Sequence, residues 1–589
     1  MAVEKLIVDH IDTWTTARQT RSTAGRGSSG KIDLYGIKKL RELILELAVR
    51  GKLVPQDSND EPASVLLKRI TAEKAELVKQ GKIKKQKPLP EISEEEKPFE
   101  LPEGWEWVRL GDLGIIGSSS RVHQKDWTSK GVPFYRAREI VSLAKNGFVN
   151  NELFITDELF ETLAQNGLHP EENDIMLTGV GTIGVSYIVK AFERFYFKDA
   201  SVLIFKNIHK LYHEYLNFIF QSPYWFNEIY KNSMGTTVHT LTISRAVDVL
   251  IPIAPEKEQY SINAKVQMLM DLCDQLEQHS LTSLDAHQQL VETLLTTLTD
   301  SQNADELAEN WARISEHFDT LFTTEASIDA LKQTILQLAV MGKLVIQDPN
   351  DEPASELLKR IAQKKAQLVK DGKIKKQKPL PPISDEEKPF ELPSGWVWCR
   401  ISDISTVGTG ATPSRDEPKY WLDGEINWVT SGETNKPFIK TTSECVTKKA
   451  IDDTNVSIYP PGTLIVAMYG QGKTRGQITE LLINAGTNQA CAAIQLIANE
   501  DSHRKFIKIF FEKSYDDLRA LASGGAQPNL NVAKISQTVI PLPPEHEQAR
   551  VVLAVNSLLN LCSSLKKHIQ SAQQTQLHLA DALTDAAIN

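Results

Sequence analysis

The segment GQGKT at 470–474 is the part of the sequence that most resembles a chemical site, because it looks like the end of a phosphate-binding loop. Such a loop wraps a phosphate with backbone amides and needs an earlier glycine, separated by four residues from its Gly-Lys-Thr end. Ala467 holds that position, and the related segment GVGTIG at 179–184 has no lysine. We therefore predict tight glycine-rich turns between strands, and we expect no ATP turnover through Lys473.

Residue types that serve catalysis or metal binding form no recognisable pattern. The 13 histidines are dispersed, and the sequence has neither a methyltransferase signature nor a nuclease-like group of paired carboxylates. The cysteines are too few and too scattered for a disulfide framework or a CxxC zinc site, and we expect them to be small core residues. They are Cys273, Cys399, Cys445, Cys491 and Cys562. We expect no catalytic residue and no metal in this chain.

Polar and basic residues gather near the glycine-rich turns, where side chains able to pair with base edges would be useful. Ordinary solvated loops have a similar composition, so both interpretations stay open. The candidates for DNA contact in the first half are Arg121, Lys125, Arg136, Arg138, Thr182 and His239. Those in the second half are Ser414, Arg415, Thr430, Ser431, Glu433, Gln471, Lys473, Arg475, Asn488, Gln489, Asn529 and Asn531.

A dense basic run, GKIKKQKPLP, occurs at 81–90 and again at 372–381. It is either a solvated linker or an arm that contacts DNA phosphates, since lysines near a duplex gain from counterion release. The candidates for phosphate contact are Lys82, Lys84, Lys85, Lys373, Lys375 and Lys376.

These runs belong to a long internal repeat. Residues 40–110 and 331–401 align without a gap, with 52 of 71 positions identical, and IPIAPEKEQ (251–259) matches IPLPPEHEQ (540–548). We call these repeated segments the frame. Between them lie two stretches, 111–248 and 402–537, that share almost no residues. The copied parts therefore hold two different domains.

The frame is predicted to be helical and the unique stretches to be mixed α/β domains. Helical periodicity and closing glycines predict two helices in each copy, the second from Pro62 to Gly81 in the first copy. Heptads after each IP-x-x-PE-x-EQ motif predict coiled-coil helices of about 30 residues, roughly 45 Å long and equivalent to about 13 base pairs. The residues of these patterns are Leu40, Ile44, Leu47, Ala48, Gly51, Leu331, Ile335, Leu338, Ala339, Gly342, Val266, Leu269, Cys273, Leu276, Val555, Leu558, Cys562, Leu565, Ile569 and Ala572.

Composition, with 41% apolar and 24% charged residues, is that of an ordinary soluble protein. We expect a cytoplasmic location, since no apolar run is long enough for a membrane span or a signal peptide. The net charge of −10 argues against a simple nucleic-acid binder. If the unique stretches bind DNA, positive charge must be clustered locally or come from partner proteins.

The ordered combination of motifs resembles the specificity subunit of Type I restriction–modification enzymes. It consists of the GW-x-W starts (104–107, 395–398), the glycine-rich turns and the IP-x-x-PE-x-EQ exits. The block from NDEPAS to GKIKKQKPLP is similar to the EcoAI-like branch, type IB, of that family. The resemblance covers about 35–589. One departure is that VPFYRARE (132–139) stands where the second domain has INWVTSGE (426–433).

The resemblance implies a non-catalytic subunit that recognises a bipartite site in double-stranded DNA. It implies two mixed α/β target-recognition domains, separated by long antiparallel coiled-coil helices with a pseudo-two-fold repeat. The implied partners are two adenine methyltransferase subunits, which use S-adenosylmethionine, and restriction subunits that use ATP and Mg. No cofactor is expected on this chain and no membrane is involved. The alternative is a tandem protein-interaction scaffold without DNA binding.

The expected division of the chain follows the repeat. It comprises a flexible lead (1–30), a helical region with a basic linker (31–100), target-recognition domain 1 (101–255), a central coiled-coil helix and connector (256–324), a second helical region with a basic linker (325–391), target-recognition domain 2 (392–544) and a C-terminal coiled-coil helix (545–589).

Overall fold

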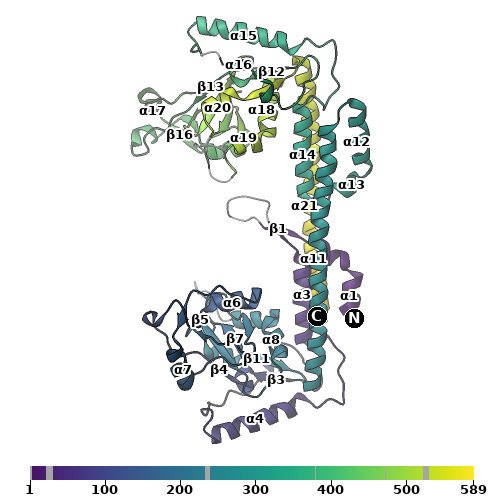
Figure 1. The fold of residues 1–589 in the computed structure, drawn as a ribbon, viewed down its shortest axis with the longest axis vertical. Coiled ribbons are helices and arrows are strands. Elements are labelled where there is room, and N and C mark those ends of the chain that lie inside the picture. Colours follow the sequence, from purple (N-terminus) through teal and green to yellow (C-terminus); the bar gives the residue numbers. More distant parts are fainter. Residues whose placement is uncertain are drawn as a thin grey trace. The chain divides into compact units, whose positions relative to one another are not determined.

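The structure, a computed structural model, describes residues 3–21, 31–231, 239–377, 380–470, 473–521 and 530–588. The chain divides into two compact units (Figure 1). Unit 1 comprises Met1–Thr20, Ile32–Leu281 and Gln573–Asn589, and unit 2 comprises Arg21–Lys31 and Thr282–Ala572. Each unit combines helices from the frame with one mixed α/β domain.

The helices predicted for the frame are present in both units. Helix α3 (Tyr35–Val49) buries its predicted apolar stripe, and α14 (Glu325–Val340) does the same. Each is followed by a glycine with positive φ, Gly51 at 66° and Gly342 at 68°, as the closing-glycine pattern predicted. The second helix of each copy is α4 (Ala63–Lys79) or α15 (Ala354–Lys370), and each begins directly after a proline.

The two long helices are longer than the 30 residues predicted. Helix α11 (Glu256–Asp300) has 45 residues and α21 (Glu545–Ile588) has 44. Neither contains glycine or proline, so nothing in the sequence stops the helix where the heptads end. In unit 1 the start of α11 and the end of α21 share one core through Leu269, Cys273, Leu577 and Ala580. The two helices are therefore antiparallel.

Residues 3–16 differ from the flexible lead expected over 1–30. They form α1 (Val3–Asp9) and α2 (Ile11–Thr16), and the Trp14 side chain is fully buried. These helices are too short for their periodicity to stand out in the sequence. The segment continues with β1 (Gln19–Arg21) and β2 (Lys31–Asp33). In unit 2 the connector forms α12 (Ala304–Glu316) and α13 (Phe318–Leu321).

The mixed α/β domain of unit 1 is attached by a pair of antiparallel strands, β3 (Glu106–Arg109) and β11 (Leu250–Ile253). Its main sheet has the order β4-β10-β7-β8, and a smaller one has the order β6-β5-β9. The strand bounds are β4 Ile115–Gly117, β5 Val132–Tyr135, β6 Phe154–Ile155, β7 Ile175–Thr178, β8 Ser186–Ile188, β9 Tyr196–Phe197 and β10 Val202–Lys206. The helices are α5 Leu110–Leu113, α6 Ala137–Asn146, α7 Asp157–Asn166, α8 His213–Gln221, α9 Pro223–Tyr230 and α10 Ile243–Asp248.

The domain of unit 2 is attached in the same way, by antiparallel β12 (Val397–Arg400) and β21 (Val539–Leu542). Its sheets have the orders β13-β20-β17-β18-β15 and β16-β14-β19. The strand bounds are β13 Ser405–Thr409, β14 Ile426–Val429, β15 Phe438–Ile439, β16 Glu444–Val446, β17 Leu464–Ala467, β18 Ile478–Leu481, β19 Gly486–Thr487 and β20 Cys491–Leu496. The helices are α16 Ile401–Ile404, α17 Lys448–Asp453, α18 Asp501–Lys513, α19 Tyr515–Leu521 and α20 Val532–Gln537.

The two domains share one topology although their sequences are unlike. The four strands β4-β10-β7-β8 correspond in order to β13-β20-β17-β18, to which unit 2 adds β15. In both domains the glycine-rich segment lies between two antiparallel strands, β7 and β8 or β17 and β18. The prediction of turns between strands is confirmed for the described residues. Among these residues, no helix is both long and apolar enough to span a membrane.

Candidate nucleic-acid interface

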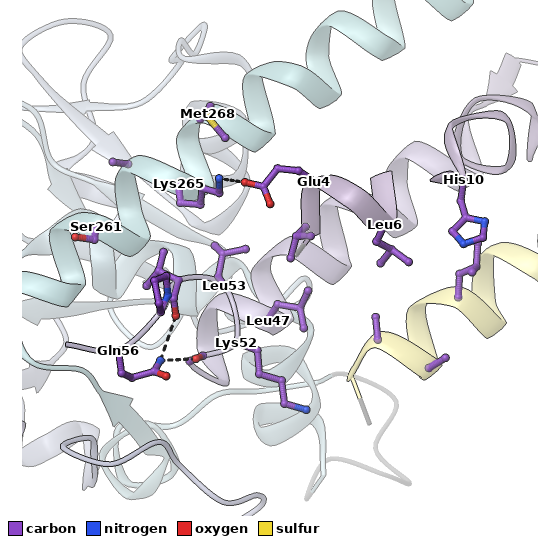
Figure 2. Close-up of a pocket in the computed structure, with 18 residues that line it drawn as sticks. Glu4, Leu6, His10, Leu47, Lys52, Leu53, Gln56, Ser261, Lys265 and Met268 are labelled. Atoms are coloured by element: carbon purple, nitrogen blue, oxygen red, sulfur yellow. Dashed lines mark hydrogen bonds and ion pairs between the residues drawn. The ribbon is translucent and has the colours of Figure 1, made fainter. Parts of the chain in front are cut away.

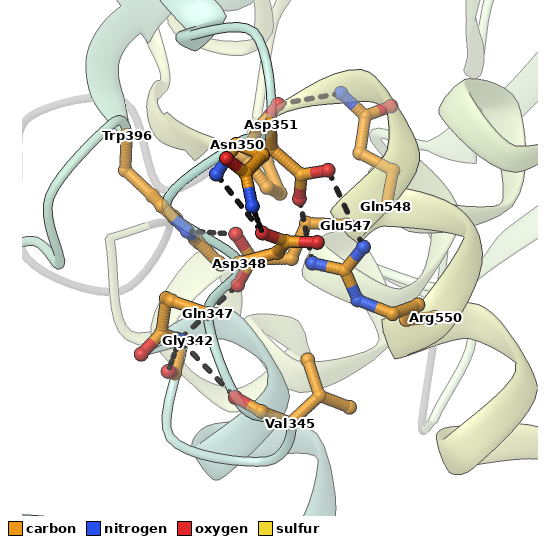
Figure 3. A network of polar contacts seen from close by, with 11 residues as sticks. Gly342, Val345, Gln347, Asp348, Asn350, Asp351, Trp396, Glu547, Gln548 and Arg550 are labelled. Atoms are coloured by element: carbon orange, nitrogen blue, oxygen red, sulfur yellow. Dashed lines mark hydrogen bonds and ion pairs between the residues drawn. The ribbon is translucent and has the colours of Figure 1, made fainter.

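A buried polar joint fixes each domain to its frame, and Figure 3 shows the joint of unit 2. In unit 2 the indole Nε1 of Trp396 donates to Glu547 Oε2 at 3.0 Å, and Gln347 Nε2 donates to Glu547 Oε1 at 3.1 Å. Unit 1 repeats the arrangement with Trp105 and Gln56 on Glu258, at the same distances. Burial raises the pKa of both carboxyls. The joint explains why the GW-x-W and PE-x-EQ motifs are copied.

One polar contact beside the joint differs between the units. In unit 2, Arg550 Nη2 forms an ion pair with Asp351 Oδ2 at 2.6 Å (Figure 3). In unit 1 the aligned positions are Ser261 and Asp60. Asp60 lies 3.8 Å from Lys257 instead, so the two frames are anchored by different ion pairs. No sequence pattern indicated that Glu258 and Glu547 are structural residues, because their motif was recognised only as the segment before the heptads.

The candidates Arg136 and Arg138 lie at the turn from β5 into α6, around one buried carboxylate. Glu139 is 3% exposed; it accepts from the Arg136 backbone N at 2.9 Å and pairs with both guanidinium groups. Burial alone would raise the pKa of Glu139, but the hydrogen bonds from both arginines outweigh it, and its pKa lies below the usual value. Arg138 is 61% exposed and also reaches Glu152 at 3.0 Å.

The equivalent turn in unit 2 carries Thr430, Ser431 and Glu433. The buried Glu433 accepts from the Thr430 backbone N at 3.1 Å and from the Ser443 backbone N at 3.0 Å. This is the same cap as at Arg136 and Glu139, and both turns follow a strand that pairs in parallel, β5 with β9 and β14 with β19. VPFYRARE and INWVTSGE are therefore equivalent in structure: the two domains share the capping glutamate and differ in the residues directly before it.

Arg415 is held between aromatic rings in unit 2. Its guanidinium lies 4.0 Å from the ring centroid of Trp421 and 5.2 Å from that of Trp428, and Nη2 contacts Glu444 at 2.7 Å. Ser414 O accepts from Trp421 Nε1 at 2.9 Å, which orients the indole. The Arg415 side chain is still 52% exposed, so its planar group is both fixed and accessible.

The glycine-rich turn of unit 2 lies against the segment that contains Asn488 and Gln489. The Met468 backbone N donates to Ala490 O at 2.7 Å, and Ala490 N donates to Asn488 Oδ1 at 3.1 Å. Gln489 is exposed and accepts a hydrogen bond from the Thr412 hydroxyl. The structure thus brings together candidates that are distant in sequence.

Other candidates in unit 2 take part in backbone contacts. Lys473 is exposed, and its carbonyl accepts from the Tyr515 hydroxyl at 2.6 Å. The Arg475 carbonyl accepts from Arg519 Nη1 at 3.2 Å. Asn531 caps α20, since its side chain accepts from the Lys534 backbone N at 2.8 Å. The candidates Gln471 and Asn529 lie outside the described residues.

The turn GVGTIG in unit 1 is joined to the segment that contains His239. Gly181 N donates to His239 O at 3.2 Å, and Leu241 N donates to Gly179 O at 2.8 Å. The exposed Thr182 is therefore close in the fold to His239, whose ring lies 5.1 Å from that of Tyr230. Arg121 and Lys125 are exposed on the segment before β5.

A cavity lies in unit 1, and the five cysteines are buried or half-buried. A cavity of about 1230 Å³ in unit 1 is lined by α1, α11, the turn after α3 and the end of α21 (Figure 2). Its polar contacts include an ion pair of Glu4 with Lys265 and a hydrogen bond from Lys52 Nζ to Ile588 O at 2.6 Å.

Burial raises the pKa of the Cys273 thiol to about 11 and that of the Cys491 thiol to about 12. Within the described ranges, no group of three or more His, Cys, Asp or Glu could hold a metal.

Comparison with known proteins finds one family profile matching the chain twice, once in each half. The family profile described as "Type I restriction modification DNA specificity domain" matches residues 102–286 and 393–573. The EcoAI specificity subunit of Escherichia coli is 49% identical, and the EcoEI specificity subunit of the same species is 46% identical; both alignments cover all of each chain. The HsdS subunit of Thermoanaerobacter tengcongensis aligns over 84% of this chain and 98% of that chain, at 17% identity and a TM-score of 0.39. The chain belongs to the family of Type I restriction–modification specificity subunits, as its resemblance to the EcoAI-like branch predicted.

Proposed function

We propose that this specificity subunit recognises a split DNA sequence, one half with each unique domain, and that the frame holds the two domains for partner subunits. One observation carries the proposal: the domains share a topology and a capping glutamate, yet differ in the side chains around equivalent turns. Domains with the same backbone and different polar surfaces suit two different base sequences.

The residues proposed to contact DNA fall into two groups. Exposed side chains around the glycine-rich turns are placed to meet base edges, and they include Thr182, Lys473 and Gln489. Glu139 and Glu433 instead fix the turns, since both are buried and accept backbone hydrogen bonds. When DNA binds, the arginines that pair with Glu139 could pair with a guanine instead, because a guanidinium group also fits guanine O6 and N7.

The partners follow from the family and stay part of the proposal. They are double-stranded DNA, two adenine methyltransferase subunits with S-adenosylmethionine, and restriction subunits with ATP and Mg. The catalytic activities belong to those partners, so this chain is the non-catalytic subunit, and we propose that it works in the cytoplasm. With a net charge of −10, the chain depends on local positive clusters or partner surfaces to hold DNA.

The test is to purify the chain with its methyltransferase partner and to map methylation on a random DNA library. We expect a site with two defined halves and an undefined gap. Methylation at one continuous motif would contradict recognition by two separate domains. Absence of DNA binding at every salt concentration, with both partners bound, would favour a protein-interaction scaffold.

A further inference from the structure

The lysine segments (81–90 and 372–381) and the helices before them are the basic part of an otherwise acidic chain. Residues 63–90 carry a net charge of +6 and residues 354–381 carry +7. The rest of the chain therefore carries −23, for a total of −10. Because these stretches lie in the frame, both copies present nearly the same basic surface.

The lysines at issue have no partner within the described structure. Lys82, Lys84 and Lys85 are exposed and make no ion pair or side-chain hydrogen bond with any described residue, and the same holds for Lys373, Lys375 and Lys376. Four of the carboxylates that follow are engaged with other cations. Glu94 pairs with Lys97 at 2.5 Å and Glu96 with Arg109 at 2.8 Å, while Asp385 and Glu387 pair with Lys388 and Arg400.

The helix before each lysine segment and the proline at its end are both anchored to the domain. In unit 1, Lys74 of α4 donates to Gly111 O at 3.0 Å, and the buried Arg109 donates to Pro90 O at 3.0 Å. Unit 2 uses Lys365, which donates to Ser405 O at 3.2 Å, and Arg400, which donates to Pro381 O at 3.5 Å. Anchoring reduces the conformational entropy that a bound segment would lose.

Each lysine segment also lies beside the short helix that leads out of its domain, α10 in unit 1 and α20 in unit 2. A groove of about 650 Å³ in unit 2 is lined by Lys376 together with Ala533 and Ser536 of α20, the helix that Asn531 caps. In unit 1 the chain approaches closely at Gly111, where an added Cβ would meet Leu89 of the lysine segment and Val247 of α10. In both units the segment therefore packs next to the short helix that leads out of the domain.

We propose that the two lysine segments bind the phosphate backbone of the DNA without regard to sequence, a function that rests on the proposed recognition of DNA. The lysines are exposed and numerous, and none of the six lies over an aromatic ring of a described residue. Protein interfaces, in contrast, are depleted in lysine and enriched in aromatic residues and arginine. A lysine ammonium acts on a phosphate as a point charge and needs no base-specific geometry. The basic surface is nearly the same in both halves, whereas the two domains differ. The lysine segments would therefore contribute affinity for any DNA, and the domains would contribute specificity for sequence.

The experiment uses the complex of the full chain with its methyltransferase partner. One variant combines Lys82→Gln, Lys84→Gln and Lys85→Gln, and a second combines Lys373→Gln, Lys375→Gln and Lys376→Gln. The control removes three lysines that have carboxylate partners: Lys97→Gln, Lys388→Gln and Lys513→Gln. Binding is measured from 50 to 200 mM salt on a duplex with the mapped site and on a duplex of equal composition without it.

Loss of three phosphate contacts should make the slope of log affinity against log salt less steep by about 2.7. Between 50 and 200 mM salt, the variant should therefore lose about 40-fold less affinity than the parent chain loses. Affinity should fall by the same factor on both duplexes, so their ratio stays unchanged, and the control should keep the slope of the parent chain. An unchanged slope in the segment variants, a changed ratio, or loss of the methyltransferase subunit instead of DNA would each overturn the proposal. If the parent complex itself bound both duplexes equally, the result would refute the proposed recognition of a DNA sequence. That outcome is distinct from those that refute phosphate binding by the lysine segments.

Discussion

At the residue scale, the polar side chains of each domain divide into those that hold the backbone and those that remain accessible. Glu433 and Glu139 share their residue type with base-contacting residues, yet both are buried in backbone caps. The sequence could not separate them from exposed candidates such as Gln489, because the spacing of a cap depends on where the preceding strand ends. The proximity of Thr182 to His239 was equally hidden, since 57 positions separate them.

A buried histidine should make the stability of unit 2 depend on pH. His503 is 1% exposed; its Nδ1 donates to Gln548 Oε1 at 3.0 Å, and its buried Nε2 has no partner among the described residues. Burial lowers the pKa of His503 below its ordinary value of 6.5, although Gln548 and the charges of Glu500 and Glu545 oppose the shift. The neutral ring therefore stabilises the fold above about pH 6.5, and this contribution is lost as the pH falls toward the lowered pKa.

Urea unfolding from pH 7.5 to 5 measures this dependence. The His503→Gln chain should lose less stability below pH 6.5 than the parent chain, whereas the His568→Gln control, at an exposed position of α21, should follow the parent. Parallel pH profiles for the parent and the His503→Gln chain would show that another group is responsible.

At the element scale, the long helices, the glycine turns and the starting strands meet at the buried glutamate of each unit. The sequence predicted the helices of the frame well, because their apolar periodicity and closing glycines are local signals. It underestimated the long helices, since they continue beyond the heptads as long as no glycine or proline intervenes. It also missed the joint itself, because three segments far apart in the chain supply Gln347, Trp396 and Glu547.

Removing the carboxylate of the joint should destabilise unit 2 more than removing a neighbouring one on the same helix. Glu547→Ala leaves the buried indole N–H of Trp396 without its acceptor, at a cost of about 1–3 kcal/mol, whereas Gln347 keeps its hydrogen bonds to Gly342 O and Val345 O. Glu545→Ala removes only an exposed ion pair with Arg360 and should cost less than about 1 kcal/mol. Both changes lie in the first turn of α21, so helix-dipole effects are matched. Equal losses in urea unfolding would argue against the joint.

At the scale of the whole molecule, one chain carries two copies of a frame and two unlike domains of one topology. The repeat was evident in the sequence, and so was the mixed α/β class of the unique stretches. Their common strand order was not, because almost no residues are shared between them. Sequence similarity followed the frame, while the backbone similarity of the domains became visible only in three dimensions.

A chain in which 402–537 replaces 111–248 tests whether each domain recognises its half-site by itself. Because both domains are attached through equivalent strand pairs, we expect the substituted chain to fold and to direct methylation to a site with two copies of one half-sequence. The reciprocal chain, with 111–248 in both places, should give the other half-sequence twice. Retention of two different halves would show that recognition depends on the frame as well as on the domain.

The paired strands at the base of each domain have a consequence for how new specificities arise. The chain enters the domain of unit 1 at Arg109 and leaves it at Leu250, and these two residues face each other in one antiparallel ladder. In unit 2, Arg400 and Val539 are paired in the same way. A gene rearrangement with two crossovers, both inside codons of the repeated frame, can therefore exchange a whole domain and leave the buried joint intact. Inheritance of a new DNA target then requires no coordinated change elsewhere in the protein.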